Sequence, residues 1–195
     1  MKKVLITGGS GLLAVNWALS IRNNYAVTLL LHRRKIFLTG ISTDIASLDS
    51  LDECISVLSK YQPDIVIHTA GLTDVEKCES SPDLAQELNV DLAKNMALAC
   101  SEQGVKLVHI STDHLFSGDQ ELVTEEVETS PVNNYAKTKF LGEQQVLENC
   151  KDALIVRTNF FGWGTEYRQS FSDFIINKLR SDETVDLFSD VFVTT

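Results

Sequence analysis

Short apolar runs alternate with longer stretches of helical periodicity along almost the whole chain. Each short run is rich in Val, Ile and Leu and is bounded by polar residues or glycine, which is typical of strands covered on both faces of a sheet. The predicted strands span residues 3–7, 26–31, 65–68, 106–111 and 153–157. The predicted helices span residues 12–21, 48–58, 84–100 and 135–147. This alternation predicts an α/β fold with a doubly wound parallel sheet and crossover helices.

The pattern contains no internal repeat, low-complexity segment or Pro/Ser-rich linker, so we expect a single domain over residues 1–195. Pro63 lies just before the third predicted strand, where it ends the preceding helix. The longest segment without clear periodicity is the acidic stretch 117–134. Because a loop of this length in a compact domain is usually functional, we expect this segment to serve the function of the protein.

The composition is that of an ordinary globular protein: of 195 residues, 44% are hydrophobic and 23% are charged. Such a chain can bury a proper core without metal ions or disulfides. Seventeen Lys and Arg against 27 Asp and Glu give a net charge of −10, so the surface repels phosphate backbones and nucleic acid is not an expected partner. No apolar run approaches the length of a membrane helix or of a signal peptide core, so we expect a cytoplasmic protein without a membrane partner.

The cysteines and histidines do not suggest a metal site. The four cysteines lie far apart, without a Cys-x-x-Cys pair or a histidine at ligand spacing, so we predict buried, reduced thiols. They are Cys54, Cys78, Cys100 and Cys150. His68 and His109 fall within predicted strands, where packing in the core is a simpler interpretation than ligand binding.

The first predicted strand leads directly into Thr-Gly-Gly-Ser-Gly-Leu-Leu-Ala at residues 7–14, which opens a helix. In a Rossmann-like fold the pyrophosphate of a dinucleotide binds at this turn. Gly8 allows a tight turn, Gly11 lets the backbone approach the phosphates, and Ala14 lets the helix pack closely on the strand. The predicted cofactor-binding residues are Gly8, Gly9, Ser10, Gly11 and Leu12. A plain glycine-rich turn is the alternative, which the position after the first strand disfavours.

The second predicted strand ends in the basic sequence His-Arg-Arg-Lys at residues 32–35. Folds that prefer NAD usually place an Asp or Glu here, to bind the ribose hydroxyls. A cationic end instead favours NADP(H), with Arg33 or Arg34 bound to the 2′-phosphate. NAD(H) is the alternative cofactor, and a solvated basic turn is the alternative interpretation.

Tyr135 and Lys139 are four residues apart and share one face of a predicted helix. A free phenol titrates near 10, which is too high for efficient proton exchange at neutral pH. A neighbouring ammonium lowers the pKa of a phenol, so we expect Lys139 to activate Tyr135 and also to hold the nicotinamide ribose. Thr112, at the end of the fourth predicted strand, is expected to bond the substrate carbonyl or the Tyr135 hydroxyl. The hydride itself comes from the cofactor.

Further candidate contacts lie at the ends of the last two predicted strands, where ligands gather in open α/β sheets. Asp113 is expected either to contact the substrate or to orient the loop that follows it. Asn159 is expected to face the substrate, whereas Phe160 and Phe161 are more simply core residues. The aromatic residues at 163 and 167 could stack on a nucleotide base or pack at the surface.

Together these residues resemble the extended short-chain dehydrogenase/reductase superfamily, and within it the dTDP-4-dehydrorhamnose reductase family. The family-like segments are residues 7–11, 64–70, 89–90, 111–118 and 131–143. The resemblance implies a catalytic trio of Thr112, Tyr135 and Lys139. It also implies that the protein reduces the 4-keto group of a nucleotide-linked 4-keto-6-deoxysugar with NADPH.

The resemblance further implies a set of cofactor contacts. Thr69, Ala70 and Gly71 would contact the phosphate and ribose region, Asp44 and Ile45 the adenine, and Ser111 the cofactor beside the catalytic trio. Two features depart from the family. His114 and Leu115 stand where the family commonly has Tyr and Val beside the substrate, so the sugar or the nucleotide can differ. Family members also continue beyond this length, so we expect the substrate domain to be largely missing here, with residues 160–195 beginning the transition to it.

Other functions remain open at this point. A sugar-nucleotide epimerase or dehydratase of the same superfamily would use the same cofactor without consuming it. A non-catalytic NADP-binding regulatory subunit, similar to the β-subunit of methionine adenosyltransferase, would share the fold without the reaction. The sequence leaves the oligomeric state open, with a homodimer as one alternative.

Overall fold

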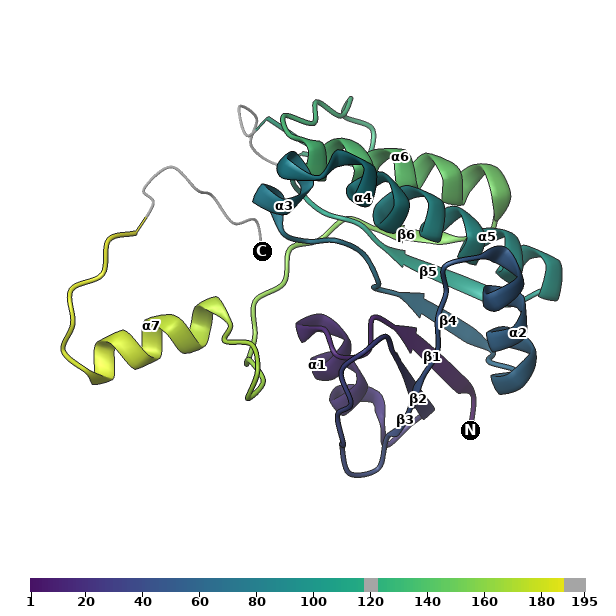
Figure 1. Cartoon of the computed structure of the whole chain (residues 1–195), viewed down its shortest axis with the longest axis horizontal. Helices are drawn as coiled ribbons and strands as arrows, with labels where there is room; N and C mark the ends of the chain where they lie inside the picture. Colours follow the sequence, from purple (N-terminus) through teal and green to yellow (C-terminus); the bar gives the residue numbers. More distant parts are fainter. Residues whose placement is uncertain (118–122, 188–195) are drawn as a thin grey trace.

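The computed structural model describes residues 1–117 and 123–187, and its sheet confirms the predicted α/β fold. Six parallel strands lie in the order β3-β2-β1-β4-β5-β6 (Figure 1), which is the order of a doubly wound Rossmann-like sheet. The strands are β1 (Lys3–Thr7), β2 (Ala26–Leu31), β3 (Ser42–Ile45), β4 (Ile65–His68), β5 (Lys106–Ile110) and β6 (Leu154–Val156).

Three of the predicted strands have the expected bounds, and the last two are slightly shorter. The sequence pattern missed β3, which has the sequence Ser-Thr-Asp-Ile and lies at the edge of the sheet. None of its four residues is buried, because an edge strand has a neighbour on one side only. A strand with a single apolar residue gives no apolar run, so hydrophobic periodicity alone cannot indicate it.

The helices connect the strands as the alternation predicts. They are α1 (Leu12–Ile21), α2 (Leu51–Tyr61), α3 (Val75–Ser80), α4 (Pro82–Gln86), α5 (Leu92–Gln103), α6 (Asn134–Asn149) and α7 (Phe171–Arg180), with a π-helical segment η1 (Glu87–Asp91) between α4 and α5. The predicted helix 84–100 is therefore divided among α4, η1 and α5. The short helix α3 and the helix α7 were not predicted.

Both faces of the sheet are covered, which explains why its strands are uniformly apolar. One core lies between the sheet and the helices α2, α5 and α6, and includes Leu5, Val66 and Met96. The other lies between the sheet and α1, and includes Ile6 and Ala14. Figure 1 shows α5 and α6 on one side of the sheet and α1 on the other. All four cysteines are free and buried, as predicted.

Helix α6 packs unusually closely on η1. A Cβ at Gly142 would lie 2.3 Å from the carbonyl oxygen of Asn89, so only glycine allows this approach. The next residue, Glu143, is almost fully buried, and both of its carboxylate oxygens accept hydrogen bonds from Arg157, which follows β6. A bidentate pair of this kind holds α6 in a fixed position against the end of the sheet.

The chain beyond β6 leaves the sheet. Phe160 and Phe161 are 38% and 64% exposed, so their interpretation as core residues is wrong: they follow the point where the backbone departs from the covered faces. Helix α7 lies apart from the sheet in Figure 1, and none of its residues is buried. The expected single domain, with a transition beginning near residue 160, stays a prediction.

Part of the acidic stretch 117–134 lies outside the described residues, and so does Gly118 of the family-like segment. Within the described ranges, no helix is both long and apolar enough to cross a membrane.

The close approach at Gly142 gives a test of the fold. In an ordinary exposed helix, replacing glycine with alanine adds stability, by about 1 kcal/mol. At Gly142 we expect Gly142→Ala to lower the free energy of unfolding by about 1–3 kcal/mol, because the added methyl group overpacks the contact with Asn89. Urea unfolding followed by circular dichroism measures the difference.

Gln144→Ala is the matched control, since Gln144 lies on the exposed face of the same helix. We expect this variant to differ from the parent by no more than about 0.5 kcal/mol. An unchanged or increased stability of Gly142→Ala would show that the helix can move away from η1 without cost.

Candidate active site

The carboxyl ends of the strands border one open cleft of about 850 Å³. It lies where the strand order reverses between β1 and β4, the position at which open α/β sheets bind ligands. Most of the predicted site residues line it. They are Gly8, Ser10, Gly11, Leu12, Arg34, Thr69, Ala70, Gly71, Ser111, Thr112, Asp113, Tyr135, Lys139 and Asn159. The predicted residues that do not line it are Gly9, Arg33, Asp44 and Ile45.

The glycine turn has the geometry that its sequence predicts. Gly8 adopts a positive φ of 63°, and a Cβ there would lie 2.9 Å from the backbone of Ala70. Gly9 faces the sheet instead of the cleft: its amide donates to the carbonyl of Leu30 at 2.9 Å. Gly11 is the N-cap residue of α1, so no side chain bonds the first amides of this helix. The first turn of α1 lines the cleft, so the free amides and the positive end of the helix dipole lie at this border.

Polar side chains join the ends of β1 and β4 beneath the cleft. The Thr7 hydroxyl lies 2.9 Å from Nδ1 of His68 and accepts a hydrogen bond from the amide of Ala70 at 3.3 Å. The Thr69 hydroxyl donates to the carbonyl oxygen of Thr7 at 2.7 Å. These contacts hold residues 69–71 against the glycine turn.

His68 and His109 are register partners on β4 and β5, and their rings stack with centroids 5.5 Å apart. Both side chains are buried, which confirms their predicted packing role. Burial lowers the pKa of His68 to about 3 and that of His109 well below its usual range, and the nearby charge of Lys139 acts in the same direction. Both rings are therefore neutral at physiological pH.

The predicted catalytic trio is brought together at one wall of the cleft. Thr112 is buried just after β5, and Tyr135 lies in the first turn of α6. The side chain of Asn133 accepts from the amide of Ala136 at 2.8 Å and so fixes where α6 begins. Lys139 lies one turn further along and is buried, with its ammonium donating to the carbonyl oxygen of Ile110 at 2.7 Å.

The titration of this trio differs from the sequence-based expectation. Burial lowers the pKa of Lys139 to about 8, against the opposing charge of Glu143. Burial raises the pKa of Tyr135, and its interaction with the Thr112 hydroxyl opposes that rise. The expected lowering by Lys139 is not found, because the ammonium is directed to Ile110 and the loss of hydration dominates at the phenol.

Asp113 and Asn159 meet at the cleft, where the Asn159 amide donates to the Asp113 carboxylate at 2.8 Å. The backbone amide of His114 donates to the Thr112 hydroxyl at 3.3 Å, and the His114 ring packs edge-on against Tyr135. Asp113 is thus part of the loop's own structure and also faces the cleft. The structure is compatible with both roles that the sequence left open for it.

Sequence reasoning named Asn89 within a family-like segment but gave it no role in the site. Its side chain lines the cleft and bonds both the amide and the carbonyl of Leu72, at 2.7 and 3.1 Å, and the Thr138 hydroxyl at 3.1 Å. Asn89 lies in η1, and π-helical turns are frequent at functional sites. An asparagine inside an otherwise helical pattern was the signal available in the sequence.

Tyr167 also lines the cleft, far from the trio in the sequence. Its hydroxyl donates to the carbonyl oxygen of Ser10 at 2.8 Å, and its ring lies 4.4 Å from the guanidinium carbon of Arg34. Of the two arginines proposed for a 2′-phosphate, Arg34 is therefore the one placed at the cleft.

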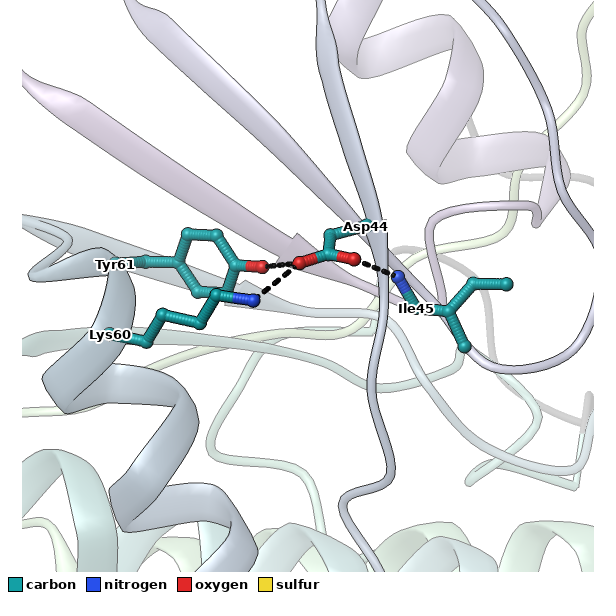
Figure 2. A network of polar contacts seen from close by, with 4 residues as sticks. All are labelled: Asp44, Ile45, Lys60 and Tyr61. Atoms are coloured by element: carbon teal, nitrogen blue, oxygen red, sulfur yellow. Dashed lines mark hydrogen bonds and ion pairs between the residues drawn. The ribbon is translucent and has the colours of Figure 1, made fainter.

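Asp44 and Ile45 are not brought to the cleft. Figure 2 shows the Asp44 carboxylate bonded to Lys60, at 2.6 Å, to Tyr61 on α2, and to the amide of Ile45. The hydrogen bond from Lys60 is the main reason that the pKa of Asp44 falls to about 2. The wall of the cleft beyond β3 is formed instead by Ala46, Leu48 and Asp49.

The donor set of the cleft suits a dinucleotide better than a metal ion. Backbone amides at a glycine turn, the arginines Arg34 and Arg168, and Lys139 are groups that bind phosphates and hydroxyls. Within residues 1–117 and 123–187, no group of three His, Cys, Asp or Glu side chains could hold a metal ion.

Comparisons with known proteins agree with this geometry. The family model of the RmlD substrate binding domain matches residues 1–194. The dTDP-4-dehydrorhamnose reductase of Salmonella typhimurium is 35% identical over 134 residues, which are 68% of this chain and 44% of that protein. The methionine adenosyltransferase 2 subunit beta of Rattus norvegicus is 35% identical over 158 residues, 80% of this chain and 46% of that protein.

A solved structure has the same fold. The crystal structure of dTDP-4-dehydrorhamnose reductase from Bacillus anthracis in complex with NADP aligns with a TM-score of 0.78 and 29% identity, over 94% of this chain and 62% of that chain. The chain thus spans about half the length of the curated relatives described above. Sequence and structure together show that the chain belongs to the RmlD substrate binding domain family.

Proposed function

We propose that this chain is the dinucleotide-binding part of an NADPH-dependent reductase acting on a nucleotide-linked 4-keto-6-deoxysugar, as in dTDP-4-dehydrorhamnose reductase. The observation that carries the proposal is that one cleft joins the glycine turn and Arg34 with Thr112, Tyr135 and Lys139. A cofactor site alone would need only the first set, whereas the second set would serve a carbonyl substrate. The similarity to named reductases supports the same reaction class.

The residues fit a pyridine dinucleotide. The amides of the glycine turn would hold the pyrophosphate, Arg34 the 2′-phosphate, and Lys139 the nicotinamide ribose. When bound, the nicotinamide supplies the hydride. NAD(H) remains the alternative cofactor, because it differs from NADP(H) only in lacking the 2′-phosphate that would face Arg34.

The protein's own groups would then handle the proton. Tyr135 would donate its hydroxyl proton to the developing alkoxide of the sugar, and Thr112 would donate a hydrogen bond to the same oxygen. Thr112 would also ease the ionisation of the phenol, because its hydroxyl opposes the rise that burial causes in the Tyr135 pKa. Asp113 and Asn159, bonded to each other in the cleft, would contact the sugar hydroxyls. The protein would act in the cytoplasm, where nucleotide sugars are made. A homodimer stays a prediction.

A regulatory role is the second candidate, and the similarity to methionine adenosyltransferase 2 subunit beta over 80% of the chain favours it. Such a subunit would bind the dinucleotide without using Tyr135 as a proton donor. The Tyr135 hydroxyl therefore distinguishes the two functions.

Removal of that hydroxyl is the main test. With the full-length protein, NADPH and a dTDP-4-keto-6-deoxysugar, we expect loss of NADPH absorbance, and we expect Tyr135→Phe to slow it by about 100-fold or more, since the proton donor is lost. The dissociation constant for NADPH should change little, because the ring and Lys139 stay in place.

Tyr25→Phe is the control, since it removes a phenol hydroxyl outside the residues that line the cleft. A Tyr135→Phe variant as fast as the parent would overturn the proposed proton donor. A parent protein that binds NADPH, consumes none and forms a stable complex with a methionine adenosyltransferase would support the regulatory role.

The buried ammonium of Lys139 gives a pH dependence. Its pKa is lowered from 10.5 to about 8, so between these values the unfolded chain binds the extra proton and the folded protein does not. Stability then rises with pH across this window, by about 3 kcal/mol for a shift of this size. We expect the free energy of unfolding of the parent, relative to Lys139→Met, to increase from pH 7.5 to about 10.5.

Urea unfolding of the parent and of Lys139→Met at several pH values measures the difference in their free energies of unfolding. The contributions of the other titrating groups cancel in this difference. The reduction rate should fall over the lower part of the same window, as the ammonium loses its proton. A relative stability that is flat between these pH values would mean that Lys139 titrates normally.

A further inference from the structure

The chain returns to the glycine turn after leaving β6. The Asn16 amide on α1 donates to the carbonyl oxygen of Trp163 at 3.0 Å, and the Tyr167 hydroxyl donates to that of Ser10 at 2.8 Å. These two contacts hold residues 163–167 against both the start and the first turns of α1. Residues 158–160 and 167–171 thereby become one border of the cleft.

The segment that carries Tyr167 has a defined turn of its own. Thr165 and Arg168 exchange backbone hydrogen bonds of 2.9 and 3.1 Å. The Asp173 carboxylate accepts from the amides of Gly164 and Ser170, at 2.7 and 2.9 Å, which ties the turn to the start of α7. The Tyr167 ring is therefore positioned from both sides along the chain.

The ring supports Arg34, which otherwise has an exposed side chain at the end of β2. The ion pairs found among the described residues do not include Arg34. An unrestrained arginine loses much of its rotamer freedom when it binds a ligand. The guanidinium carbon lies 4.4 Å from the ring centroid, a distance at which cation–π attraction restricts the side chain before any ligand arrives.

We propose that Tyr167 is a specificity residue: its ring holds the Arg34 guanidinium at the border of the cleft, where it selects a dinucleotide with a 2′-phosphate over one with a free 2′-hydroxyl. This inference rests on the proposed function, because it requires a dinucleotide in the cleft. A guanidinium binds a phosphate through two charge-assisted hydrogen bonds and gains far less from a neutral hydroxyl. Fixing Arg34 in advance therefore strengthens the binding of NADP(H) and leaves that of NAD(H) nearly unchanged.

The ring and the hydroxyl of Tyr167 can be separated by substitution. Tyr167→Phe removes the bond to Ser10 and keeps the ring under Arg34, whereas Tyr167→Leu removes both. We expect Tyr167→Leu to raise the dissociation constant for NADPH about three- to tenfold, a range between the values for an exposed and for a desolvated cation–π contact. The dissociation constant for NADH should stay within about twofold, and Tyr167→Phe should retain most of the preference for NADPH.

The measurement is a fluorescence titration of the full chain with NADPH and with NADH. Arg34→Leu should abolish the preference for NADPH, and in that background Tyr167→Leu should change the ratio of the two constants no further. Phe37→Leu is the control for a substituted surface aromatic residue, since Phe37 is 88% exposed and does not line the cleft.

Two outcomes would overturn the inference. One is a Tyr167→Leu variant with the parent's ratio of constants, and the other is an equal loss of NADPH and NADH affinity, which would make the residue a structural tether only. A parent protein that binds neither nucleotide would instead refute the proposed function. Thermal unfolding of each variant, within a few degrees of the parent, verifies that a changed ratio does not come from a damaged fold.

Discussion

The parallel pairing of β1 with β4 is the constraint on which the site depends. It places the glycine turn, which follows β1, next to residues 69–71, which follow β4, and the strand order reverses between them. Each of β1 and β4 is buried and has a paired strand on both sides, so the carboxyl ends of these two strands cannot move independently. The distance between the two segments is then fixed by the hydrogen bonds of the Thr7 and Thr69 hydroxyls and by the close approach of Gly8 to Ala70. The cleft is a product of this central pairing, and its walls are added by elements further out.

Helix α6 supplies the chemically important wall, and its position is set at three points along its length. Asn133 caps its start, Lys139 bonds the end of β5 through Ile110, and Glu143 bonds Arg157 beyond β6. Between these points, Gly142 allows contact with η1. The same helix therefore carries the groups proposed for proton transfer and the groups that position them. Burying Lys139 for this purpose has an electrostatic cost, visible in its lowered pKa.

The parts of the protein that the sequence predicted are those controlled by neighbouring residues. The glycine turn, the buried strands and the face shared by Tyr135 and Lys139 follow from local pattern and spacing. Contacts between distant residues were not predictable in the same way. Tyr167 meets Ser10 across 157 positions, and Asp44 is drawn to Lys60 and Tyr61 on α2, away from the cleft. The direction in which the Tyr135 pKa shifts likewise depends on burial, which a sequence indicates only indirectly.

The stacked pair His68 and His109 has a consequence for the protein in acid. Both rings remain neutral while folded, but each would take up a proton near pH 6.5 once exposed to water. Because the unfolded chain binds these protons and the folded one does not, acidification below that value favours unfolding. Two imidazoles at the centre of the sheet thus make the fold sensitive to mild acid, although neither takes part in the proposed reaction.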